Sequence, residues 1–211
     1  MKILIVAPQS ELEVQQEIVD AIGGDGDQTK VLSGSVSIRM FLDTVQTWRP
    51  DAIHFAGHGA DSRILFEDGV LDASLVADAV RSIGGVKLCI FNSCESLNMA
   101  LACYMAGAAY AIGWSDQVSN DVATSFAFTF WASWKMSGSV LGAFQTGRES
   151  VRYFPNHHMP SLLNGRGDAY TSQMKALQRE VDRLTRLTYW LSGLLAVSIV
   201  FGFLNAVWLH I

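Results

Sequence analysis

The feature that most constrains the fold is the regular alternation of short apolar runs with longer amphipathic stretches over residues 1–153. Continuous apolar runs predict strands that are covered on both faces, and amphipathic stretches between them predict crossover helices. The predicted strands cover 2–8, 27–34, 51–57, 86–92 and 108–114. Because strand and helix alternate along the chain, we expect an open, mostly parallel α/β sheet of five or six strands with helices on both faces.

The predicted helices begin and end at capping signals. The first, over 10–24, opens on Ser10 with Glu13 three residues later and closes on glycines. An Asp-Gly pair within 64–71 predicts a small hairpin, and Asp72 is expected to cap the helix that follows it. The further predicted helices cover 35–48, 73–85, 95–106, 121–138 and 139–154.

Two polar motifs stand directly after predicted strands. HFAGHG covers 54–59 and FNSCES covers 91–96. In open α/β sheets, functional groups gather beyond the carboxyl ends of the strands, in the crevice where strand order reverses. A right-handed crossover makes these two strands parallel and adjacent, with tips about 5 Å apart. The sequence therefore predicts that the side chains of His58 and Cys94 meet.

An imidazole next to a thiol indicates nucleophilic catalysis. The histidine takes the thiol proton and leaves a thiolate that attacks a carbonyl carbon. Cys94 is therefore the predicted nucleophile and His58 the predicted base. Gly59 has no side chain, so a substrate carbonyl can approach its amide. We expect the N–H groups of Gly59 and Cys94 to form the oxyanion hole.

Packing roles are the alternative for each of these residue types. Cysteine is among the residues most often buried, and we expect Cys89 and Cys103 to be core residues. A structural role for Cys94 stays open on the pattern alone. His54 lies inside a predicted strand, where we expect a core or supporting imidazole.

Composition excludes several classes of partner and cofactor. The net charge is −5 and the basic residues form no long run, so nucleic acid is not expected to bind. Three cysteines without C-x-x-C spacing indicate neither a disulfide framework nor zinc, and favour a reducing compartment. The pair at 157–158, His-His, has no Cys or carboxylate at ligand spacing, so no metal is expected. No glycine-rich phosphate cradle is present, and no cofactor is predicted.

The carboxyl-terminal end differs in character, because 187–211 contains no Asp, Glu, Lys or Arg. The 21 residues at 189–209 have aromatic residues near both ends and predict a single transmembrane helix, about 30 Å long. A buried core helix is the alternative. Four basic residues precede this segment: Lys175, Arg179, Arg183 and Arg186. By the positive-inside rule we expect a tail-anchored, single-pass protein of the inner membrane with its domain in the cytoplasm.

Two shorter segments separate the expected domain from the membrane. Residues 154–172 are rich in Pro, Gly and Asn and predict a linker. Residues 173–188 predict an amphipathic stalk helix, and an apolar seam with alternating spacings of three and four runs through 174–191. That seam predicts a homo-oligomer formed by a coiled coil together with the membrane helix. A solvated stalk whose cations meet anionic lipid is equally compatible with the pattern.

The sequences at 51–72, 89–96 and 107–150 together resemble those of the CHAT-domain peptidases. These are caspase-like proteins of the clan that includes caspases, separase, gingipain and clostripain. The resemblance covers about residues 1–152, and the opening at 2–18 is similar to that of bacterial effector-associated members. It implies a caspase-hemoglobinase fold for 1–153 and a cysteine endopeptidase whose dyad is His58 and Cys94.

The resemblance also indicates where a substrate side chain would bind. Family members form the pocket for the residue before the scissile bond in the loop that here runs from Trp114 to Asp121. Asp116 and Asp121 can face a basic side chain there, although capping of the next helix by Asn120 or Asp121 is the alternative. The chain departs from many members in having FNSC where they have Leu-Ser and a small residue before the cysteine.

Two classes of function follow. The first is a membrane-anchored endopeptidase that cuts a membrane-associated or co-encoded protein, and the resemblance suggests a regulated effector of antiviral defence or cell death. The second is a catalytically silent caspase-fold protein that acts by oligomerisation, membrane disruption or scaffolding. The activating signal and the natural substrate cannot be deduced from the sequence.

Overall fold

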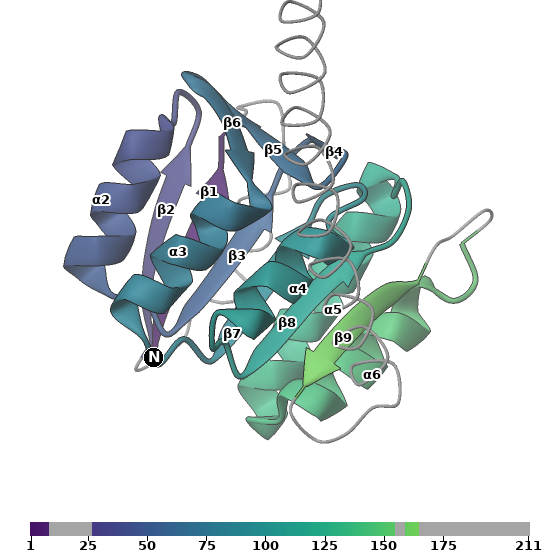
Figure 1. Cartoon of the computed structure of the whole chain (residues 1–211). Coiled ribbons are helices and arrows are strands. Elements are labelled where there is room, and N and C mark those ends of the chain that lie inside the picture. Colours follow the sequence, from purple (N-terminus) through teal and green to yellow (C-terminus); the bar gives the residue numbers. More distant parts are fainter. Residues whose placement is uncertain (9–26, 155–158, 165–211) are drawn as a thin grey trace, which may run out of the picture. The chain divides into compact units, whose positions relative to one another are not determined.

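A computed structural model of the chain describes residues 1–8, 27–154 and 159–164, and these lie in one compact unit, Met1–Gly165 (Figure 1). The predictions for the first helix, the stalk, the coiled coil, the membrane helix and the His-His pair fall outside the described residues. No helix within the described ranges is long and apolar enough to span a bilayer.

The main sheet has six strands in the order β2-β1-β3-β7-β8-β9. All neighbouring strands pair in parallel except β9, which is antiparallel to β8. The open, mostly parallel α/β sheet predicted from the sequence is therefore confirmed. The bounds are β1 (Lys2–Ala7), β2 (Gln28–Ser33), β3 (Ala52–Ala56), β7 (Leu88–Asn92), β8 (Tyr110–Trp114) and β9 (Pro160–Asn164).

The last strand corrects the predicted linker. Residues 160–164 form β9, with Trp114 paired to Pro160 and Tyr110 to Asn164. The prediction that 154–172 is only a linker is therefore wrong for this part, and the sheet extends past residue 153. Proline is tolerated at the first residue of a strand, because no ladder donor is needed there. A short apolar run lies among the Pro, Gly and Asn residues of this segment. It pairs with β8 only in the folded chain, so the composition alone did not indicate a strand.

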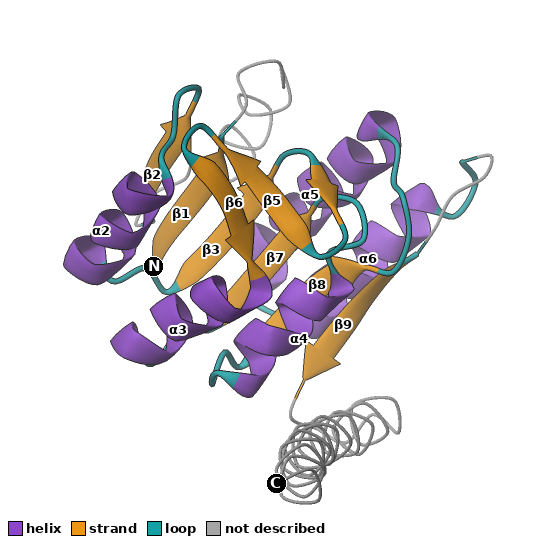
Figure 2. Cartoon of the chain, turned by 45° about the horizontal axis from the view of Figure 1, so that its top comes forward, coloured by secondary structure: helices purple, strands orange, loops and turns teal. Residues whose placement is uncertain are grey.

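Helices cover both faces of the sheet, as predicted (Figure 2). On one face, α2 packs on α3 and α3 on α4; on the other, α5 packs on α6. The bounds are α2 (Ile38–Trp48), α3 (Ala73–Ile83), α4 (Leu97–Met105), α5 (Asn120–Ser137) and α6 (Val140–Val151). Asp72 caps α3 through its carboxylate and the Leu75 N–H, which confirms that prediction.

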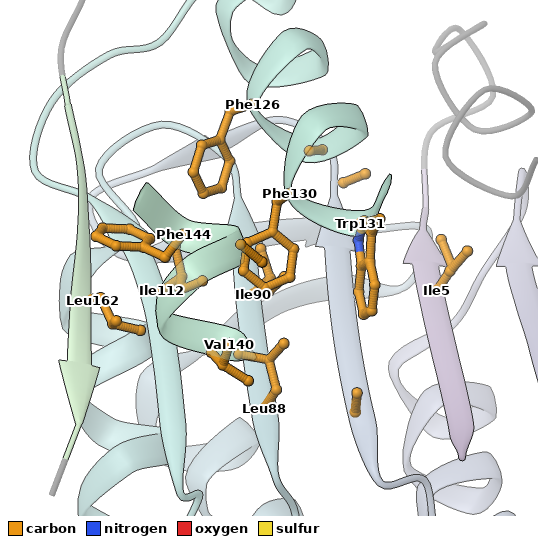
Figure 3. Close-up of a cluster of buried hydrophobic side chains, with 14 of the residues drawn as sticks. Ile5, Leu88, Ile90, Ile112, Phe126, Phe130, Trp131, Val140, Phe144 and Leu162 are labelled. Carbon is orange, nitrogen blue, oxygen red and sulfur yellow. The ribbon is translucent and has the colours of Figure 1, made fainter. Parts of the chain in front are cut away.

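The larger core lies between the sheet and the pair α5 and α6 (Figure 3). Phe126, Phe130 and Trp131 of α5 pack there against strand residues such as Ile90. A Cβ on Gly147 of α6 would lie 2.9 Å from the Phe126 ring, so the two helices approach too closely for a larger residue. Close packing of this kind holds β3 and β7 rigid beneath their carboxyl ends.

A small antiparallel sheet follows β3. It consists of β4 (Gly59–Ala60), β5 (Arg63–Phe66) and β6 (Gly69–Asp72), in that order. The predicted hairpin of β5 and β6 is confirmed, and β4 is an addition that the sequence did not indicate. Figure 1 shows this sheet at the carboxyl-terminal end of the parallel strands.

Candidate active site

His58 and Cys94 follow neighbouring parallel strands at equal distances. The last paired residues of β3 and β7 are Ala56 and Asn92, so each candidate stands two positions beyond the same pair. His58 is exposed and Cys94 is half-buried. The structure therefore confirms the adjacency of the two strands. It corrects one detail, because strand order reverses between β1 and β3, on the side of β3 that faces away from β7.

Gly59 brings the two motifs into contact. A Cβ on Gly59 would lie 2.9 Å from the Cys94 carbonyl oxygen, 3.0 Å from the Arg63 carbonyl oxygen and 3.1 Å from Ser93 Cβ. Two of these three neighbours are backbone atoms, which cannot move without moving the strands. The requirement for glycine here comes from close backbone approach, and it places the two predicted oxyanion residues side by side.

The Cys94 sulfur contacts the loop between β8 and α5. The Val118 N–H donates to Cys94 Sγ at 3.3 Å, and the thiol donates to the Val118 carbonyl at 3.5 Å. Among the described residues, no hydrogen bond joins the sulfur to His58. The structure thus brings the two candidate loops together, but the proton-transfer contact predicted between the side chains is not formed in it.

Glu95 ties three loops to one another. Its Oε2 accepts the Asp61 N–H at 2.9 Å, and its carbonyl accepts the Ser62 hydroxyl at 3.3 Å. Its own N–H donates to the Asp116 carbonyl at 3.0 Å. The loops that follow β3, β7 and β8 therefore meet at this one residue.

Ser96 supports the turn that carries Cys94. Its hydroxyl lies 2.7 Å from the Ser93 carbonyl and 3.0 Å from the Phe91 carbonyl, and its oxygen accepts the Trp114 N–H at 3.2 Å. The side chain is fully buried. Sequence reasoning missed the roles of Ser96 and Glu95. The only available signal was that two polar residues follow Cys94 between a buried strand and a helix.

His54 belongs to the core, as expected. It is fully buried in β3, and its Nδ1 accepts the Trp131 indole N–H at 3.1 Å. Burial lowers the pKa of His54 from 6.5 to about 3, because the imidazolium would lose its hydration. The ring is therefore neutral at pH 7 and, with Nδ1 as acceptor, carries its proton on Nε2. That Nε2 has no hydrogen-bond partner among the described residues.

The predicted pocket residues have different environments. Trp114 is fully buried and donates its indole N–H to Asn92 Oδ1 at 3.2 Å, so a substrate cannot contact it in this structure. Asp116 and Asp121 are both exposed. Ser119 occupies the N-cap of α5 without a side-chain hydrogen bond, and Asp121 lies in the first turn. The capping alternative is therefore wrong for both Asn120 and Asp121, although an acidic residue in a first turn favours the helix dipole.

The remaining thiols are core residues. Cys89 and Cys103 are free and fully buried. Burial raises the pKa of Cys103 well above its ordinary value, and a hydrogen bond to Cys89 adds to the shift. No group of three or more His, Cys, Asp or Glu within the described ranges can hold a metal ion.

No family model matches the chain, and no curated protein matches it significantly.

Proposed function

We propose that this chain is a cysteine endopeptidase in which Cys94 is the nucleophile and His58 the base. The observation that carries the proposal is the common register of β3 and β7, which ends in Ala56 opposite Asn92 and leaves both residues two positions further on. Gly59 adds support, since a Cβ there would lie only 2.9 Å from the Cys94 carbonyl oxygen. The resemblance to CHAT-domain peptidases supplies the reaction type.

The chemistry follows from those positions. The Cys94 thiol passes its proton to His58, and the thiolate attacks the carbonyl carbon of a peptide bond. The N–H groups of Gly59 and Cys94 stabilise the oxyanion. The amine departs with the proton from the imidazolium, and water then hydrolyses the thioester.

The resting structure requires one change before this reaction. The sulfur now bonds to Val118, so it must turn about the Cα–Cβ bond of Cys94 toward His58. Catalytic hydrogen bonds are often absent or long in free enzymes and tighten when substrate binds. Displacement of Val118 by a peptide or an activating partner is consistent with an enzyme that is latent until it is triggered.

Cleavage of a peptide library by the full chain in detergent tests the proposal. We expect Cys94→Ala and His58→Ala to abolish cleavage, and Cys103→Ala, a buried cysteine in α4, to retain it. Cleavage that persists in Cys94→Ala would contradict the proposal. For a latent enzyme the same variants are compared in cells, where loss of toxicity or of phage defence in Cys94→Ala is expected.

A second function is favoured by one observation. Both hydrogen-bond partners of the Cys94 sulfur are backbone groups of Val118, and this arrangement is also compatible with a protein that keeps the fold without catalytic activity. Such a protein would act through oligomerisation at the membrane that 189–209 is predicted to span. If deletion of 187–211 abolishes toxicity while Cys94→Ala leaves it unaltered, this second function holds. In either case we propose a cytoplasmic domain at the inner membrane; for the endopeptidase we propose a membrane-associated or co-encoded protein as the substrate.

A further inference from the structure

Three residues at the candidate site have an unusual backbone. Asp61, Ser62 and Glu95 have φ values of 49°, 62° and 50°, in the left-handed region that L-residues other than glycine rarely adopt. The fourth such residue in the described part is Arg49, which follows α2, where a left-handed residue commonly ends a helix. Left-handed residues outside helix ends persist only where their surroundings hold them.

Asp61 and Ser62 form the two-residue turn between β4 and β5, with Ala60 paired to Arg63 on either side. A turn with two left-handed residues suits the twist of a hairpin, but Asn-Gly or Asp-Gly is the preferred sequence because serine is disfavoured there. Local preference alone therefore does not determine this turn. Contacts from outside the hairpin are needed to hold it.

Those contacts come from Glu95 and from α4, the helix that follows it. The Glu95 carboxylate accepts the Asp61 N–H at 2.9 Å, and the Glu95 carbonyl accepts the Ser62 hydroxyl at 3.3 Å. Asn98 Nδ2 then donates to Ser62 Oγ at 3.0 Å. Each residue of the turn is thus bonded to the segment that follows Cys94. A carboxylate is a stronger acceptor than a neutral group, which favours Glu95 for this task.

Glu95 also binds a third loop, the one between β8 and α5. The Glu95 N–H donates to the Asp116 carbonyl at 3.0 Å, two residues before Val118, whose backbone contacts the Cys94 sulfur. Glu95 is half-buried and has a left-handed backbone; its carbonyl and carboxylate bind the β4–β5 turn, while its N–H binds the loop between β8 and α5. One residue therefore joins the β4–β5 turn, the loop with Cys94 and the loop that contacts the sulfur.

We propose that Glu95 is a positioning residue, which holds the β4–β5 turn, and with it His58 and Gly59, against the loop of Cys94. This inference rests on the proposed function for its catalytic consequence, although the loop contact itself does not. Glu95 need not touch a substrate. It limits the distance between His58 and Cys94 by fixing the turn at the end of β4, the strand that follows His58.

Hydrogen exchange of the Asp61 amide, followed by mass spectrometry on the full chain in detergent, tests the contact directly. Glu95→Ala removes the acceptor, and we expect exchange in 59–62 to accelerate about tenfold. Glu95→Gln keeps an acceptor oxygen and is expected to stay within about threefold of the wild type. Glu67→Ala removes the same charge at the far turn of the small sheet, where Glu67 is exposed, and is the matched control.

Cleavage kinetics test the consequence. For Glu95→Ala we expect kcat to fall about 100-fold with KM little changed, and for Glu95→Gln we expect most of kcat to be retained. Unchanged exchange in Glu95→Ala, or equal losses in the Gln and Ala variants, would overturn the inference. Failure of the proposed function looks different, because the wild type and all variants would then lack cleavage while the exchange differences persist.

Discussion

In both β3 and β7, a residue type that is buried within the strand occurs again just beyond its carboxyl end, where it is at least partly exposed to solvent. β3 carries His54 in its buried middle and is followed by His58, which is exposed. β7 carries Cys89 in its buried middle and is followed by Cys94, which is half-buried. Four or five positions along a strand thus separate a core side chain from one that can react.

The comparison shows that the environment of a histidine or cysteine in this protein depends on its position along the strand and not on its residue type. In the middle of the sheet, helices exclude water from both faces, and desolvation keeps an imidazole neutral. Beyond the strand ends, loops replace the ladder, and polar groups find partners in other loops. His54 and Cys94 illustrate this contrast: the first has one aromatic partner, and the second accepts a backbone N–H from a loop.

The largest difference between buried and strand-end residues is expected in the rate of thiol alkylation. In the native protein, we expect iodoacetamide to modify Cys94 at least about 1,000-fold faster than Cys89 or Cys103, because buried thiols react only after the fold opens. Peptide mapping by mass spectrometry after a short pulse measures the three rates. In guanidinium chloride all three should react alike. Comparable native rates would show that Cys94 has no accessible sulfur.

Acid should destabilise the middle of β3 through His54. Its pKa is about 3 when folded and 6.5 when exposed, so below pH 6.5 the unfolded chain binds a proton that the folded chain does not. The free energy of unfolding should therefore fall by up to about 1.4 kcal/mol per pH unit between pH 6 and 4. Urea unfolding of wild type and His54→Asn measures this slope. Equal slopes in the two proteins would show that titrating groups other than His54 cause the pH dependence of the free energy of unfolding.

Replacing glycine by alanine should lower the free energy of unfolding much more at Gly59 than at Gly57. Gly59→Ala forces a Cβ to within 2.9 Å and 3.0 Å of two carbonyl oxygens. We expect a loss of about 2–3 kcal/mol in the free energy of unfolding, as for other overpacked sites. Gly57→Ala is the control, because its Cβ would meet Pro8 at an ordinary 3.6 Å. Similar losses in both variants would mean that the close approach of the two motifs is not what demands glycine.

The smallest effect is expected from two serines in the Cys94 turn. Ser96→Ala removes a buried hydroxyl that serves three backbone groups and should cost about 1–2 kcal/mol. Ser93 is the control, since its buried Oγ has no hydrogen-bond partner in the described part of the chain. Ser93→Ala should be neutral or stabilising, because no partner is left unsatisfied. A larger loss for Ser93→Ala in chemical unfolding would contradict these assignments.

Much of the site could be predicted because it stands next to strong local signals. The apolar runs before His58 and Cys94 mark where each strand ends, and the structure places both ends within one residue of the prediction. Gly59 was singled out as an oxyanion residue, and its closeness to Cys94 is now seen. The role of Glu95 had no such signal, because its partners lie in loops 21 to 34 positions away, and the role of Ser96 depends in part on Trp114 of β8, 18 positions away.

The sequence by itself determined the α/β class, the parallel strands and the two motifs at strand ends, because hydrophobic periodicity and capping act over a few residues. Only the tertiary structure decided that 160–164 joins the sheet, that Trp114 is buried, and that Cys94 contacts Val118 while Glu95 joins three loops. These contacts pair residues 21 to 54 positions apart, as with Glu95 and Asp116 in their loops and Tyr110 and Asn164 in their strands. Long-range pairing depends on which surfaces meet when the whole core is packed, and no local pattern records it.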